Sequence, residues 1–222
     1  MKKSLSGWLP VLTFIFAGCS VMKVSQRDPA DIKDLYLVHP VSEIEYVTKG
    51  NRMQYSRNFS DSCTRIMAVE LPVLLPDRNV RQIEYDIDTT RMLEQEVARL
   101  FQYIGDRKEI ANLCINRSID EILASRNIDY AMFLWATGYT RTNSNFAGQI
   151  ALGVAVAIIS VGSVYYAPVK SVVNLKVIII DRQNKNIAMY NHQYLQNYDP
   201  LKPRDMRNAL KNLTHHYFYK NR

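Results

Sequence analysis

The chain has 222 residues, of which 47% are hydrophobic, and it carries a formal net charge of +7. This hydrophobic content is sufficient for a folded core and excludes a disordered chain, and the length suits one domain of ordinary size. The modest positive charge fits contact with anionic lipid or phosphate, but nothing else in the sequence indicates a nucleic-acid partner.

The first residues have the parts of a secretory signal peptide. Two lysines follow the initial methionine, and a short apolar stretch occupies residues 8–17. This stretch is too short for a helix to cross about 30 Å of hydrocarbon, so cleavage is expected. The sequence Phe-Ala-Gly-Cys at residues 16–19 resembles the bacterial lipobox, in which a small residue precedes the cysteine that receives diacylglycerol. We therefore expect residues 1–18 to be removed as a lipoprotein signal peptide and Cys19 to carry the lipid.

The next segments lead from the predicted anchor into the domain. Residues 19–34 are polar and are interpreted as a lipid-anchored tether, followed by a single periplasmic α/β domain over residues 35–222. Residues 35–47 are β-prone, and the polar residues 50–62 predict a loop. Residues 65–75 are rich in branched apolar side chains and stop before a Pro-Asp pair, which predicts a strand.

Two helices are predicted in the middle of the chain. Residues 89–104 place their apolar side chains on one face, and Gly105 follows where a helix C-terminus favours glycine. Residues 118–126 predict a second helix, in which Ser118 and Glu121 have the spacing of a capping box.

Two apolar runs follow. Residues 128–139 predict a buried strand, in which Gly138 marks a bulge or bend. Residues 150–167 form an uncharged apolar insert, for which three interpretations remain open: a transmembrane helix, a buried or interfacial element, and a membrane-inserting hairpin of an oligomeric pore. The favoured expectation is that protein or a membrane surface covers the insert and that it does not span the bilayer.

The C-terminal third predicts a hairpin and a helix. Residues 170–181 and 186–195 are β-rich and flank a polar turn, and an amphipathic helix begins after Pro203. The helix carries a basic stripe, which is a candidate contact for a lipid headgroup or a partner; it consists of Arg204, Arg207 and Lys211.

The predicted order is strand, helix, helix, strand, strand, strand, helix. This order indicates an α/β (α+β) sandwich, in which helices pack on a small mixed sheet.

Three short phrases also resemble a group of envelope lipoproteins that includes CsgG-like and LpoB-like proteins. They are IMAV at residues 66–69, NIDYAMFL at residues 127–134 and VIIID at residues 177–181. The resemblance implies an anticodon-binding-domain-like fold and a non-catalytic protein that binds or assembles other envelope components. The chain departs from the group at residues 135–136 and 185–186, where the group commonly has a glycine.

Two further cysteines, Cys63 and Cys114, would lie in an oxidising compartment if the chain is exported. Pairing between them and two buried free thiols are both open on the sequence alone.

No set of residues in the sequence indicates catalysis, a metal or a cofactor. The four histidines are scattered without metal-ligand spacing, and the common nucleophile, phosphate-loop and dinucleotide motifs are absent. We expect a non-enzymatic lipoprotein of the outer membrane, facing the periplasm, with a binding, scaffolding or assembly role. Its expected partners are the membrane, through the lipid, and an envelope protein or further copies of itself. The alternative is a subunit of an oligomeric CsgG-like secretion pore.

Overall fold

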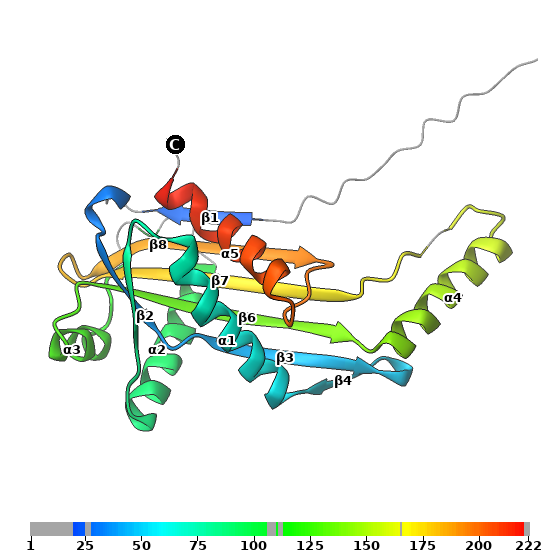
Figure 1. Ribbon diagram of the computed structural model, residues 1–222, viewed down its shortest axis with the longest axis horizontal. Helices are drawn as coiled ribbons and strands as arrows, with labels where there is room; N and C mark the ends of the chain where they lie inside the picture. Colours follow the sequence, from blue (N-terminus) through cyan, green and yellow to red (C-terminus); the bar gives the residue numbers. More distant parts are fainter. Residues whose placement is uncertain (1–19, 25–27, 106–109, 111–112, 165, 220–222) are drawn as a thin grey trace, which may run out of the picture.

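The computed structural model describes residues 20–24, 28–105, 110, 113–164 and 166–219, so the predicted signal peptide and Cys19 lie outside the described residues. The strands of this part of the chain form one open mixed sheet, and helices cover both of its faces (Figure 1). The predicted α/β (α+β) sandwich is therefore confirmed.

The sheet has the order β1-β8-β7-β6, and beyond β6 two strands lie end to end. Of these, β2 is flanked by β5 and β3 by β4. Both β2 and β3 run parallel to β6, and the break between them contains Pro40, which has no N–H to donate to a ladder. The strands are β1 (Ser20–Val24), β2 (Asp34–Val38), β3 (Val41–Thr48), β4 (Arg52–Tyr55), β5 (Asn79–Ile83), β6 (Tyr130–Arg141), β7 (Ser171–Asp181) and β8 (Asn186–Gln196).

The centre of the sheet is the antiparallel set β6, β7 and β8. The predicted hairpin and the predicted buried strand are confirmed here. Gly138, however, pairs with Val173 in an unbroken register between β6 and β7, so it marks no bulge. A Cβ atom at Gly138 would lie 2.1 Å from the carbonyl oxygen of Val172, and this close approach explains the glycine.

The helices divide between the two faces and one end of the sheet. A first core lies under α1 and α5, and a second lies on the opposite face under α2 and α3. The helices are α1 (Arg57–Leu74), α2 (Ile87–Gly105), α3 (Arg117–Ser125), α4 (Asn143–Ile159) and α5 (Pro203–Phe218), with short 3-10 turns η1 (Pro29–Asp31) and η2 (Lys49–Asn51).

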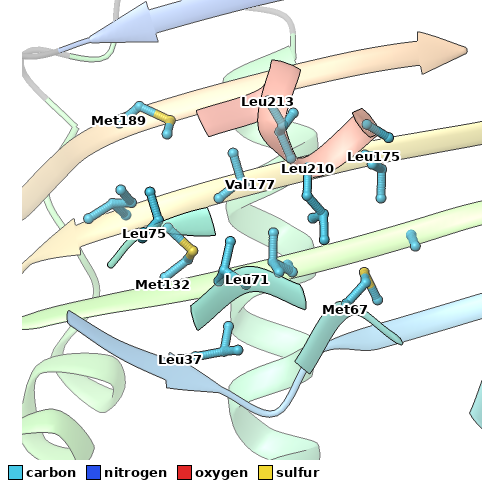
Figure 2. Close-up of a cluster of buried hydrophobic side chains, with 14 of the residues drawn as sticks. Leu37, Met67, Leu71, Leu75, Met132, Leu175, Val177, Met189, Leu210 and Leu213 are labelled. Carbon is cyan, nitrogen blue, oxygen red and sulfur yellow. The ribbon is translucent and has the colours of Figure 1, made fainter. Parts of the chain in front are cut away.

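The predicted strand over residues 65–75 is wrong, because this segment is the second half of α1. Met67 and Leu71, four residues apart, lie on one side of the helix and are buried in the first core (Figure 2). Val69 and Val73 are exposed on the other side. The branched side chains favoured a strand locally, but the helical spacing of the buried residues decides the structure.

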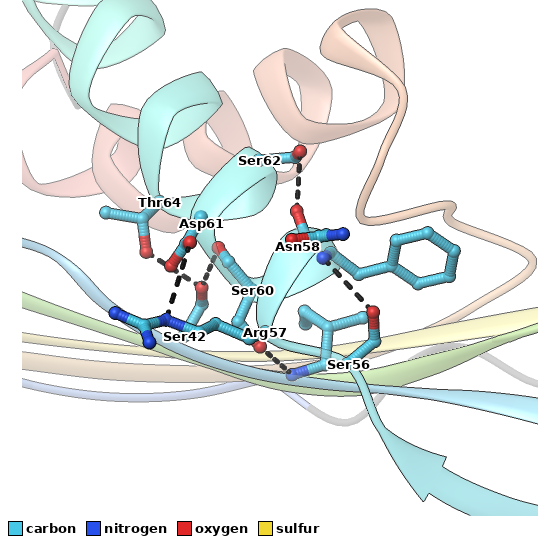
Figure 3. Close-up of polar contacts among 10 residues, drawn as sticks. Ser42, Ser56, Arg57, Asn58, Ser60, Asp61, Ser62 and Thr64 are labelled. Atoms are coloured by element: carbon cyan, nitrogen blue, oxygen red, sulfur yellow. Dashed lines mark hydrogen bonds and ion pairs between the residues drawn. The ribbon is translucent and has the colours of Figure 1, made fainter.

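The predicted loop over residues 50–62 is also wrong, since it contains β4 and the start of α1. The serines that suggested a loop bind the helix to the sheet instead (Figure 3). The Ser42 hydroxyl donates to the Ser60 carbonyl at 2.5 Å, and the Ser60 hydroxyl accepts from the Ile44 N–H at 2.9 Å. The hydroxyl of Ser56 caps the N-terminus of α1.

The predicted helices α2 and α3 are confirmed, but the cap of α3 differs from the prediction. The side chain of Asn116 accepts the Ile119 N–H at 2.9 Å and is the N-cap. The carboxylate of Glu121 accepts from the Arg117 guanidinium and not from the Ser118 N–H, which a capping box would require. An Asn cap satisfies the same free N–H groups that a capping box would satisfy.

The N-terminal segment joins the sheet earlier than the sequence indicated. Residues 20–24, which belong to the predicted tether, form the edge strand β1 and pair antiparallel with β8. Lys23 extends across the end of α2, where its ammonium donates to the Ile104 carbonyl at 2.7 Å. These five residues of the predicted lipid-anchored tether are therefore part of the sheet.

Candidate functional site

The most distinctive surface of the molecule is built by α4 and the segment that returns from it to β7. We refer to residues 143–169 as the α4 projection; Tyr165 within it lies outside the described residues. Figure 1 shows α4 extending beyond the end of the sheet and not covering either face. The domain's own core therefore does not bury the apolar insert at residues 150–167. Among the described helices, none has the length and apolar character needed to cross a membrane.

The base of the α4 projection is fixed to the sheet by a polar network. The Thr142 hydroxyl accepts the Asn145 N–H and caps α4. Arg141 donates to the Val169 carbonyl at 2.9 Å and to the Asn145 side-chain oxygen at 2.8 Å. The Asn145 amide in turn donates to the Thr48 carbonyl at the end of β3, at 2.8 Å. These bonds hold both ends of the projection, so α4 leaves the sheet in a defined direction.

The helix and the returning segment pack closely against each other. A Cβ atom at Gly153 would lie 2.3 Å from the backbone oxygen of Tyr166. The glycine is therefore required by the approach of a backbone, whereas a Cβ at Gly148 on the same helix would meet nothing.

The backbone N–H groups at the tip of the α4 projection are hydrogen-bonded within the tip. Each N–H of residues 160–164 donates within the tip: Ser160 to the Val156 oxygen, Val161 to Ile158, Gly162 to Ala157, Ser163 to the Ser160 carbonyl, and Val164 to the Ser160 hydroxyl. The hydroxyl of Ser160 donates back into the same turn. The turn needs no water to complete the hydrogen bonds of these N–H groups.

From Ile150 onward, the large exposed side chains of the α4 projection are apolar. Exposure rises toward the tip, where Ile159 is 83% and Val161 is 91% accessible to solvent. The other large exposed hydrophobic residues of the projection are Ile150, Leu152, Val154, Ile158, Val164 and Tyr166.

Charge is excluded from the α4 projection and reappears at its base. Residues 142–169 contain no charged side chain. The strand and turn ends from which the projection emerges carry four cations: Lys49, Arg52, Arg141 and Lys170. The ammonium of Lys170 lies 5.7 Å from the centre of the Phe146 ring on α4. The nearest acidic residues of β3, Glu43 and Glu45, lie further from this end of the sheet.

The predicted basic stripe on α5 is only partly available for a ligand. Arg207 donates two hydrogen bonds, at 2.6 and 3.0 Å, to the carboxylate of Glu70 on α1, which is buried. These hydrogen bonds raise the pKa of Arg207. Arg204 and Lys211 are exposed. Arg207 thus joins α1 to α5, and no local sequence pattern indicates Glu70 as its partner because the two residues are far apart in the chain.

The two cysteines lie apart and are free in the structure. Cys63 is buried in the first core, and Cys114 is exposed in an isolated β-bridge with Asn186. The pairing considered from the sequence is therefore not formed in the structure.

A groove of about 1140 Å³ lies at the opposite end of the sheet, between the end of β1, the end of α5 and the segment before β5. The Arg78 guanidinium donates to the Ile32 carbonyl there and lies 5.3 Å from the centre of the Phe218 ring. The charges of its wall are mixed, so the groove favours neither an anion nor a cation. In the residues that the structure describes, no three His, Cys, Asp or Glu side chains are grouped closely enough to hold a metal ion.

No protein-family model matches the sequence, and no curated protein matches it. Several solved structures resemble the chain in part. A PelC dodecamer from Paraburkholderia phytofirmans is 11% identical, with a TM-score of 0.37, and the match covers 89% of this chain and 91% of that one. The LpoB C-terminal domain from Salmonella enterica is 10% identical, with a TM-score of 0.28 and coverage of 73% and 82%.

Lipoprotein GNA1162 from Neisseria meningitidis is 10% identical, with a TM-score of 0.31, and the match covers 73% of this chain and 79% of that one. Likenesses as remote as these assign neither a family nor a function to the chain.

Proposed function

We propose that this protein is a lipid-anchored lipoprotein of the cell envelope with a non-catalytic binding, scaffolding or assembly role. The lipid is attached to Cys19, and the protein lies in the outer membrane with its domain facing the periplasm. Outer-membrane sorting rests on the sequence, since Ser20 and not aspartate follows Cys19.

The observation that carries the proposal is the position of β1. The strand begins at Ser20, directly after Cys19, and is hydrogen-bonded to β8. Acyl chains contribute about 0.8 kcal/mol per buried CH₂, so two or three chains hold a protein firmly on a bilayer. Without a free segment between the lipid and the sheet, the anchor holds the folded domain itself against the membrane. This arrangement suits a protein that positions partners at the membrane surface.

The anchor is tested with Cys19→Ser, because Cys19 is the predicted site of the lipid. Cells are labelled with a palmitate analogue, and inner and outer membranes are separated on a sucrose gradient. The parent protein is expected to incorporate the label and to fractionate with the outer membrane, whereas the variant carries no label. Equal labelling of the two proteins contradicts the proposal, and so does a parent protein that never fractionates with membranes.

The second candidate function is a subunit of an oligomeric secretion pore. It is favoured by the exposed apolar surface of the α4 projection, which a neighbouring subunit or the bilayer would cover. A pore subunit is expected to form a ring that survives mild detergent and appears as one high-mass species in native mass spectrometry. Crosslinking in intact membranes followed by purification separates this outcome from a scaffold, which is expected to crosslink to a different envelope protein.

A further inference from the structure

The α4 projection lies toward the end of the molecule at which the lipid is expected. Ser20, the first residue of β1, pairs with Gln193, near the end of β8, and β1 runs away from α4 (Figure 1). Helix α4 follows the C-terminal end of β6, and the segment after α4 enters the N-terminal end of β7. Both of these strand ends lie on the same side of the molecule as the start of β1. The N-terminal end of β1 therefore lies on the side of the sheet from which the α4 projection extends.

The apolar character of the α4 projection suits the interior of a membrane better than water. A helix that is apolar all round is normally buried, and α4 exposes large hydrophobic side chains on several sides. A bilayer interior also requires that backbone N–H groups be bonded internally, and the N–H groups of residues 160–164 are bonded in this way.

The dimensions and charges fit insertion into one leaflet. Residues 150–159 span about 15 Å at 1.5 Å per residue, which is half of a hydrocarbon core of about 30 Å. The polar residues of α4, Asn143, Ser144, Asn145 and Gln149, precede this apolar part. The cations at the base of the projection lie where the phosphates of that leaflet would be.

We propose that the α4 projection is a membrane-inserting element whose tip enters the leaflet that holds the Cys19 lipid, without crossing the bilayer. The proposal rests on the proposed function, since it takes the anchored bilayer as the occupant of this surface. The lipid and the tip then form two attachment points, which fix the orientation of the domain on the membrane.

The test places a tryptophan at the tip of the full lipidated protein, reconstituted in phosphatidylethanolamine and phosphatidylglycerol vesicles. Ile159→Trp is compared with Val73→Trp, a matched replacement of an exposed apolar residue on α1. Vesicles with lipids brominated along the acyl chains quench tryptophans that reach the hydrocarbon. The fluorescence of Trp135, measured in the parent protein, is subtracted as background. Circular dichroism checks that both variants are folded.

In vesicles, the fluorescence emission of the tryptophan in Ile159→Trp is expected to shift to shorter wavelength, and brominated lipids are expected to quench most of this emission. The emission of the tryptophan in Val73→Trp is expected to be the same in vesicles as in buffer. Proteins that float with the vesicles while both tryptophans escape quenching overturn the inference but leave the anchor intact. A failure to float with the vesicles overturns the proposed function instead. A blue shift without quenching, present also in Cys19→Ser free of vesicles, shows that a second copy covers the tip and overturns the inference.

Discussion

Burial divides the two cysteines of the described chain into an inert and an accessible thiol. Burial raises the pKa of Cys63 to about 12, so the thiolate that reacts with maleimides is nearly absent at pH 8. Cys114 is exposed. We expect the native protein, without reductant, to label at Cys114 at once and at Cys63 only after unfolding in urea, as followed by mass spectrometry. Two cysteines that resist labelling until a reductant is added would show a disulfide and contradict the free thiols.

The cap of α3 gives a second prediction for single residues. Asn116→Ala removes the acceptor of the Ile119 N–H and is expected to lower the free energy of unfolding by about 1 kcal/mol. Ser118→Ala, the control, is expected to change it by less than about 0.5 kcal/mol. Urea denaturation measures both changes. A larger loss of unfolding free energy for Ser118→Ala than for Asn116→Ala would show that Ser118 is the N-cap of α3.

Which residues could be recognised from the sequence depended on how local their interactions are. Cys19 could be predicted as a lipid site because a lipobox is recognised from neighbouring residues, and its lipidation stays a prediction. The pair of Glu70 and Arg207 and the network around Arg141 join segments distant in the chain, so no local pattern indicates them. Even the cap of α3 was displaced by two residues, because Asn and Ser are both good caps and only the backbone conformation separates them.

At the scale of the elements, periodicity was reliable where helix and strand propensities agreed with it. This was so for α2, α3, β6, the β7–β8 hairpin and α5. The two signals disagreed for α1: branched residues suggested a strand, whereas the four-residue spacing of Met67 and Leu71 fits the helix that forms. Periodicity gave no sign of β1, because a five-residue edge strand receives its stability from β8, far away in the chain.

The two glycines of α4 predict opposite effects of alanine. Gly153→Ala is expected to push Tyr166 away, because the new Cβ atom would meet its backbone oxygen at 2.3 Å. Amide hydrogen exchange of residues 160–164 at the tip should then become faster, because their hydrogen bonds lose the support of the returning segment. Gly148→Ala meets no atom and improves helix propensity by about 1 kcal/mol, so it is expected to slow exchange within α4. Identical hydrogen-exchange profiles for the two variants would contradict the close packing of α4 against the segment that returns to β7.

At the scale of the whole molecule, the two cores share the strands β6 and β7. Met132 and Ile179 belong to the first core, whereas Phe133 and Ile178 belong to the second. Loss of either core therefore removes support from the same sheet, and we expect the domain to unfold as one cooperative unit.

This cooperativity is tested with Leu71→Ala in the first core and Ile119→Ala in the second, each expected to cost about 2–5 kcal/mol. Trp135 packs against Phe101 in the second core and reports on that face. In both variants its fluorescence and the far-UV circular dichroism are expected to change at the same, lowered urea concentration. A Leu71→Ala protein whose fluorescence transition stays at the parent midpoint would show that the faces unfold separately.

The pairing of β1 with β8 also sets an order for folding. The chain is made from its N-terminus, so β1 is the first described strand to be synthesised and its partner is the last. Until residues 186–196 are available, β1 has no strand with which to pair, and the backbone groups of Val21 and Val24 have no hydrogen-bond partners in the sheet. A chain that stops before β8 therefore leaves β1 without a partner, and docking of β1 requires that the β7–β8 hairpin is present. Slow closure is expected of contacts so far apart in sequence, which makes this edge one of the last parts of the fold to form.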